Sequence, residues 1–471
     1  MMRVVLVALD GLRPDLVGPG LTPNLARLAE QGTRFVNATS VFPSETRVAT
    51  PSLVTGCRPE RHGMVANTIY DRGANRLVRT KTPEELASLA AGSVSPIEAE
   101  TVGELLARRG RSFALVSSGS AGAARLLHPQ AERLGQFRWS PDDPGCRGPG
   151  LEARFGPPPP PALPNLGRIA HAGRVFVEHV LAELEPDVAL LWLSEPDFSF
   201  HYAGLGSPVA REALRAADAE LGRVMAWRDG QPDRERIVLV AFSDHGHVTG
   251  TRRVSVVQAL NAAGFRAGED GESDIVVAGG GAVGLWLRDQ AALPSVAEFL
   301  AAQPWVGVLL ALAPDRLPAG LALPLSLTGS AHRRSPDLVC TFAGSDAPDP
   351  WGLSGTAAFD SADVPESGGM HGGLHRTELG TVLVMAGGPV RRGARVREPC
   401  DLCDIMPTVL HLLGLSGPGM DGKPLLAALD ATEERGASAE RFSLARGYAL
   451  DGLRDSRGRF YPRAARPAER G

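Results

Sequence analysis

Acidic and histidine side chains follow the ends of several apolar runs in this sequence. They are Asp10, Asp197, His201, Asp244, His245 and, in a later Met-His-Gly-Gly stretch, His371. A carboxylate beside an apolar segment is costly to bury unless it is paired, hydrogen-bonded or bound to a metal. Three Asp and three His suit a borderline metal such as zinc and are enough for two sites. Taken singly, each Asp is more simply a turn or helix-cap residue, and Asp10-Gly11 alone indicates a turn.

The apolar runs themselves predict strands that are buried on both faces. They span residues 4–9, 113–116, 188–193, 237–242 and 381–385. Helical spacing lies between them over 22–31, 98–109, 169–184 and 210–227. This alternation predicts an α/β fold with a mostly parallel central sheet sandwiched by helices. Ligands of such sheets bind beyond the carboxyl ends of the strands, so the six side chains are expected at one edge.

Composition excludes several other classes of protein. The chain has 471 residues, and its 49 basic and 53 acidic residues give a net charge of −4, which argues against a nucleic-acid-binding surface spread over the chain. Five cysteines are too sparse for a secreted disulfide scaffold. No apolar run reaches the about 20 residues of a membrane span or has the form of a signal peptide, so we expect a cytoplasmic protein. The oligomeric state is left open.

Three further motifs are more specific than the acidic and histidine residues. Phe-Pro-Ser-Glu-Thr occupies 42–46, Leu-Val-Thr-Gly occupies 53–56, and Pro-Glu-Arg-His-Gly-Met-Val-Ala-Asn-Thr-Ile-Tyr-Asp occupies 59–71. With Asp-Ile-Met-Pro-Thr at 404–408 and Met-Asp-Gly at 420–422, they resemble the alkaline phosphatase superfamily. Within it, the sequence looks like the nucleotide pyrophosphatase/phosphodiesterase branch.

The resemblance implies a role for each matching residue. Thr46 would be the nucleophile, and Asn67 would bind a phosphoryl oxygen. Two divalent metal ions would be bound, with zinc favoured and Mn²⁺ as the alternative. One ion would take Asp197, His201 and His371, and the other would take Asp10, Asp244 and His245 with the oxygen of Thr46.

Elementary chemistry favours the same roles. A threonine hydroxyl is a weak nucleophile that needs a base or a metal. Two metals about 4 Å apart can clamp the attacking and leaving oxygens of an in-line displacement. Asn67 can donate its amide N–H to the developing charge, and Thr46 begins a predicted helix over 46–53 whose N-terminal N–H groups favour an anion. The simpler alternatives are a helix N-cap for Thr46 and a turn residue for Asn67.

The sequence departs from the family in the residue after the nucleophile. Nucleotide-cleaving relatives have an aromatic residue there that helps to hold the base, whereas this chain has Arg47. Arg47 is predicted to meet an anionic group of the substrate, or else to face solvent or pair with Glu45. Relatives that hydrolyse phosphonoacetate use lysines near the site, and only Lys81 is available for that here. His375 is a second-choice metal ligand to His371.

These observations predict a metal-dependent phosphoric ester hydrolase of the phosphodiesterase or nucleotide pyrophosphatase type. It would act through a covalent phospho-threonine intermediate on a small-molecule phosphate ester or nucleotide-like substrate. The alternatives are a phosphomonoesterase or phosphonate hydrolase with the same site, and a non-catalytic binding relative. The catalytic core is expected at 1–249 plus 366–430, an insertion or cap at 250–365, and an arginine-rich tail at 431–471. Within the insertion, the Gly-x-Gly-x-x-Gly pattern at 279–284 is predicted to be a turn rather than a dinucleotide site.

Overall fold

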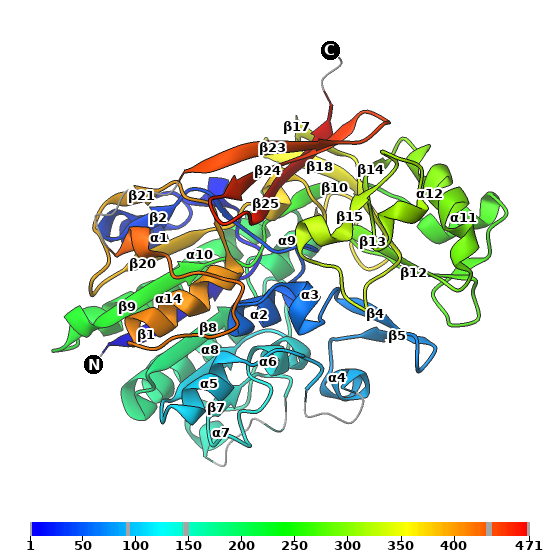
Figure 1. Ribbon diagram of the computed structural model, residues 1–471. Helices are drawn as coiled ribbons and strands as arrows, with labels where there is room; N and C mark the ends of the chain where they lie inside the picture. Colours follow the sequence, from blue (N-terminus) through cyan, green and yellow to red (C-terminus); the bar gives the residue numbers. More distant parts are fainter. Residues whose placement is uncertain (1, 91–94, 144, 146–149, 430–435, 469–471) are drawn as a thin grey trace.

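The central element of the protein is an eight-stranded sheet (Figure 1). The computed structural model describes residues 2–90, 95–143, 145, 150–429 and 436–468. The strands, in spatial order, are β21 (Ala394–Val396), β2 (Thr33–Phe35), β20 (Leu383–Ala386), β9 (Ile237–Phe242), β1 (Arg3–Leu9), β8 (Val188–Leu193), β6 (Phe113–Ser117) and β7 (Phe137–Trp139). Only β20 runs antiparallel to its neighbours in this sheet, which confirms the predicted mostly parallel sheet.

Helices cover both faces of this sheet, because alternate side chains of its strands point to opposite sides. Val4, Leu6 and Ala8 of β1 pack in one apolar core with α2 (Thr46–Thr55), α5 (Val102–Arg108), α6 (Ala121–Leu127) and α14 (Ile405–Leu412). Val5, Val7 and Leu9 pack in a second core with α1 (Pro23–Gln31), α8 (Leu166–Val175) and α10 (Pro208–Asp229). The helix expected over 169–184 lies within α8 and the π-helical segment that continues it, Phe176–Leu184.

Two smaller sheets follow β9 along the chain. A six-stranded sheet contains β11 (Ala267–Gly268), β12 (Ile275–Ala278), β13 (Ala282–Leu287), β16 (Leu338–Phe342), β14 (Val306–Ala311) and β15 (Leu323–Pro324). The strands β12 and β13 are antiparallel, so the glycines at 279–281 form a hairpin turn, as predicted. Packed on this sheet are α11 (Val256–Ala262) and α12 (Leu293–Ala301).

A four-stranded sheet joins this part of the chain to the central sheet. Its strands are β17 (Gly344–Pro348), β18 (Ser354–Phe359), β10 (Val248–Arg253) and β19 (Gly369–Met370). The antiparallel pairing of Val248 with Met370 brings the chain just after β9 next to the chain just before His371. This sheet spans the predicted boundaries between core and insertion, and the division into those parts stays a prediction.

Residues 437–467 of the predicted tail form a sheet of their own. Strands β23 (Ala437–Ser443), β24 (Tyr448–Asp455) and β25 (Phe460–Pro467) form an antiparallel sheet, and the predicted tail residues 431–435 and 469–471 lie outside the described residues. Leu450 and Phe460 share an apolar cluster with Val308 and Leu310 of β14. Within the described residues, no helix is both long and apolar enough to span a membrane.

The cysteines make no disulfide among the described residues. Cys57, Cys340, Cys400 and Cys403 are buried thiols, and Cys146 lies outside the described part of the chain. The Cys400–Cys403 pair lies at the entry to α14, where it packs in the first core. These thiols therefore act as small apolar side chains.

Candidate active site

The turn after β1 places Asp10 at the edge of the central sheet. Asp10 Oδ2 accepts a hydrogen bond from Trp192 Nε1 at 2.9 Å, and the N–H of Gly11 donates to Asp244 Oδ1 at 3.0 Å. Gly11 has a φ of 70°, and a Cβ there would lie 2.3 Å from the His247 ring. A glycine is therefore needed to let two neighbouring strand ends converge.

Asp197 and His201 lie on one face of the short helix α9 (Asp197–Ala203), which follows β8. Residues four apart on a helix are neighbours, so both side chains face the same space. His201 Nε2 lies 3.4 Å from Asp197 Oδ1 and 3.1 Å from His371 Nε2. His371 Nε2 is also 3.6 Å from Asp197 Oδ1, so the predicted group of Asp197, His201 and His371 is assembled in the structure.

Four histidines are oriented in the same way by the main chain. In each, Nδ1 lies within hydrogen-bond distance of a backbone carbonyl: His201 with Gly369, His245 with Gly246, His247 with Gly11, and His371 with Ser44. Since a carbonyl can only accept, Nδ1 must carry the proton in each ring. The four Nε2 atoms are left as lone-pair donors, which is the form that binds a metal ion.

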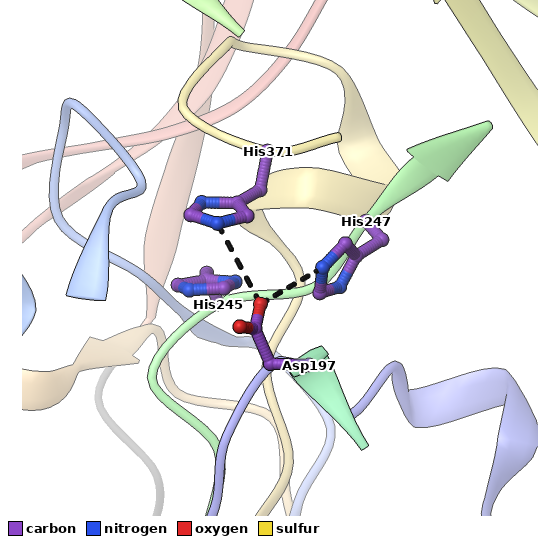
Figure 2. A group of neighbouring side chains, drawn as sticks. All are labelled: Asp197, His245, His247 and His371. Carbon is purple, nitrogen blue, oxygen red and sulfur yellow. Dashed lines mark ion pairs between the residues drawn. The ribbon is translucent and has the colours of Figure 1, made fainter. Parts of the chain in front are cut away.

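His247 is the site residue to which the sequence analysis gave no role. It is buried, and its Nε2 lies 3.0 Å from Asp197 Oδ1 (Figure 2). The local sequence could have indicated it. Alternate residues of an extended chain point to the same side, and His247 stands two residues after the predicted ligand His245. Figure 2 shows His245, His247 and His371 around the Asp197 carboxylate.

Several buried polar atoms of this cluster lack a hydrogen-bond partner within the described structure. They are Asp10 Oδ1, Asp197 Oδ1, Asp244 Oδ2 and His247 Nε2. They fall in two groups in which one ligand atom per residue lies within 4.8 Å of the others: Asp197 with His245, His247 and His371, and Asp10 with Asp244 and His245. Because unsatisfied buried carboxylates are costly, this donor set fits bound divalent cations.

The pKa shifts of the clustered side chains indicate that a positive charge would stabilise this site. Burial and the charge of Asp244 hold the pKa of Asp10 well above its usual range, and burial also raises the pKa of Asp244. Burial lowers the pKa of His247 to about 4 and that of His371 well below its usual range. At Asp197, burial alone would raise the pKa, but the facing histidines, His201 first, hold it well below its usual range.

Thr46 and Asn67 lie beside this cluster, at the start of α2 and just before β4 (Thr68–Asp71). Thr46 Oγ1 is 3.2 Å from His245 Nε2, and that nitrogen is 3.3 Å from Asp244 Oδ2. Asn67 accepts the Arg47 backbone N–H at 3.0 Å through Oδ1, and its own N–H donates to the Glu45 carboxylate. The bond from Arg47 fixes the amide orientation and leaves the Nδ2 group of Asn67 as the donor for the cleft.

All of these residues line or adjoin one open cleft of about 1,020 Å³. Asp10, Thr46, Asp197 and His371 lie on its lining, which confirms that the strand ends meet at one edge of the sheet. Arg47 also lines the cleft, and its Nε donates to Thr80 Oγ1 at 3.0 Å.

His375 does not join the cluster of candidate ligands. It caps α13 (Arg376–Leu379), and its Nδ1 lies 2.8 Å from Thr377 Oγ1. Its Nε2 is 3.3 Å from Asp346 Oδ1. The first-choice residue, His371, is the one that the fold brings to Asp197.

Comparison with known proteins identifies the family of this chain. Residues 4–372 match the family model of the type I phosphodiesterases / nucleotide pyrophosphatases. The chain belongs to this family, and thereby to the alkaline phosphatase superfamily that the motifs indicated.

Individual relatives agree with this assignment. Over 261 residues the chain is 26% identical to rat ectonucleotide pyrophosphatase/phosphodiesterase family member 1, covering 52% of this chain and 24% of the relative. It is 37% identical over 81 residues to an uncharacterized pyrophosphatase/phosphodiesterase of Schizosaccharomyces pombe, and this match covers 17% of each chain. The chain thus spans about a quarter of the length of the first of these relatives.

A solved structure shares the fold over nearly the whole chain. It is an inactive threonine-to-alanine variant of murine ectonucleotide pyrophosphatase/phosphodiesterase 5 in complex with AMP. It superposes with a TM-score of 0.63 at 17% sequence identity, covering 91% of this chain and all of the murine one.

Proposed function

We propose that this protein hydrolyses phosphodiester or pyrophosphate bonds through a covalent intermediate on Thr46, with two divalent metal ions, zinc in the first instance. The observation that carries the proposal is the convergence of the Thr46 hydroxyl with two groups of unsatisfied carboxylate and imidazole atoms in one cleft. Membership of the phosphodiesterase family supports the reaction class. The AMP complex of the murine relative supports a nucleotide-like substrate.

The residues of the two groups would hold the metal ions. Asp10, Asp244 and His245 surround one position beside Thr46, and Asp197, His201, His247 and His371 surround the other. A divalent cation bound there supplies positive charge that lowers the pKa of a hydroxyl and neutralises phosphoryl oxygens. The backbone carbonyls that hold each Nδ1–H keep the imidazole Nε2 atoms directed at these positions.

The chain's own groups then carry the reaction. Thr46 Oγ1, fixed at the first turn of α2, attacks phosphorus and forms a Thr46 phosphoester while the substrate's alcohol or phosphate departs. The Nδ2–H of Asn67 donates to a phosphoryl oxygen as negative charge develops. Water then attacks the same phosphorus, which restores the Thr46 hydroxyl and releases the phosphoryl product.

The test compares two esters and three proteins. Purified protein with zinc or manganese is expected to hydrolyse bis-p-nitrophenyl phosphate faster than p-nitrophenyl phosphate. Thr46→Ala should abolish turnover, whereas Thr46→Ser, which keeps a hydroxyl, should retain part of it. Faster turnover of the monoester would identify a phosphomonoesterase instead. No hydrolysis of either ester with any divalent metal would refute the enzymatic function and favour a binding protein.

A further inference from the structure

One stretch of the cleft lining next to Thr46 is cationic. Arg47 follows Thr46 on α2, Arg79 ends strand β5 (Arg76–Arg79), and Lys81 stands two residues later. The strand β5 pairs with β4 in a hairpin, and β4 begins directly after Asn67. All three cations line the cleft. We call this set, Arg47 with Arg79 and Lys81, the cationic wall.

The cationic wall forms no ion pair with the part of the protein that the structure describes. Among the described residues, no carboxylate lies within ion-pair distance of Arg47, Arg79 or Lys81, although Arg168 on the same cleft pairs with Asp142 at 2.9 Å. Burial lowers the pKa of Arg47, although the more distant charges of Glu45 and other carboxylates oppose this shift. A guanidinium stays charged in proteins, so this half-buried cation has no direct ion pair among the described residues. Such a cation is stabilised by an anion that enters the cleft from outside.

Arg47 is also held in place rather than free to move to solvent. Its Nε donates to Thr80 Oγ1 at 3.0 Å, and the Thr80 hydroxyl in turn donates to the Asn67 carbonyl at 2.9 Å. Because Thr80 stands between Arg79 and Lys81, this bond ties α2 to the segment that carries the other two cations. The positively charged groups therefore stay next to the residue that would bind the scissile phosphoryl group.

The rest of the cleft has a different charge. The part of the lining that comes from residues 253–364 carries Arg253 but also the acidic residues Glu269, Asp360 and Asp363. An anionic part of a substrate is thus attracted to the hairpin side of the cleft and not to the side of the later sheets. A planar guanidinium binds a phosphate or carboxylate through paired hydrogen bonds, which suits a discrete anionic group.

We propose that the cationic wall binds a second anionic group of the substrate. The favoured substrates are then small phosphodiesters or pyrophosphates that carry a further phosphate or carboxylate beyond the scissile phosphorus. This inference rests on the proposed function, since it assigns the substrate class of the same cleft. It also gives a role to the arginine that directly follows Thr46.

The test uses two chromogenic esters that differ by one anionic group. They are thymidine 5′-(p-nitrophenyl phosphate) and the same ester with a 3′-phosphate. The wild-type protein is expected to favour the 3′-phosphorylated ester about tenfold in kcat/KM, as for one charge-assisted contact. This preference should weaken at high salt, because screening reduces interactions of exposed charges.

Two variants test whether the cationic wall, and not positive charge elsewhere on the protein, causes this preference. The double variant Arg79→Met, Lys81→Met should bring the ratio of the two kcat/KM values close to one. Arg76→Met is the matched control: it lies on the same strand, contacts Ser88 instead of the cleft, and should keep the wild-type ratio. Equal kcat/KM of the wild type for both esters, or an unchanged ratio in the double variant, would overturn this inference alone. No cleavage of either ester by the wild type would overturn the proposed function and this inference with it.

Discussion

Replacing Asp244 by Asn should stabilise the metal-free protein and remove its response to zinc. The carboxylate oxygens of Asp10 and Asp244 lie within 4.8 Å of each other in a fully buried position. At an effective dielectric constant of about 20, two charges at that separation repel by about 3 kcal/mol. The asparagine keeps the Oδ1 that accepts the Gly11 N–H at 3.0 Å, so the substitution removes charge without removing this hydrogen bond.

The assay is denaturant unfolding in EDTA and again with saturating zinc, together with a count of bound metal. In EDTA at pH 8, Asp244→Asn is expected to be more stable than the wild type by up to about 3 kcal/mol. With free zinc at about 1,000 times its Kd the order reverses, because binding then adds about 4.1 kcal/mol to a protein that binds the ion. The variant should bind at least one ion fewer.

Asp142→Asn is the matched control. Asp142 lines the same cleft but is an exposed partner of Arg168, so its loss should cost no more than about 1 kcal/mol and leave the zinc response intact. If Asp244→Asn were less stable than the wild type in EDTA and gained as much from zinc, the carboxylates would be a hydrogen-bonded network and the metal site would be refuted.

Three other outcomes follow from individual contacts. His247→Gln removes the Nε2 atom 3.0 Å from Asp197 Oδ1 and should weaken zinc binding about tenfold or more in a chelator competition; unchanged affinity would show that His247 only packs. Asn67→Ala should lower kcat for a diester about a hundredfold by removing a donor to the phosphoryl group, and a change in KM alone would contradict that role. Burial raises the pKa of Glu378 from 4.5 to about 7, so the folded state holds its proton longer and stability falls as pH rises from about 4.5 to 7. That loss is about 3 kcal/mol by linkage, and Glu378→Gln should abolish it in urea unfolding at several pH values; the same pH dependence in the variant would exclude Glu378 as its source.

The strands that position the site residues could be predicted from the local sequence. The predicted runs 188–193 and 237–242 match the observed β8 and β9 to the residue, because a strand buried on both faces must be apolar throughout. The predicted helix after Glu45 likewise begins at Thr46. Elements with a less regular pattern were not predicted, and the C-terminal sheet was missed because charged residues interrupt its apolar residues and only some of its side chains are buried.

The sequence by itself determined the α/β class and the family, and it predicted Thr46, Asn67 and six of the seven clustered Asp and His residues. These features follow from short sequence segments that lie at strand ends and in turns. Only the tertiary structure brought His247 to Asp197, excluded His375, and joined Arg47 to Arg79 and Lys81 on one cleft. The reason is that these contacts depend on the register of β10 against β19 and on the path of the β4–β5 hairpin, which long-range packing decides.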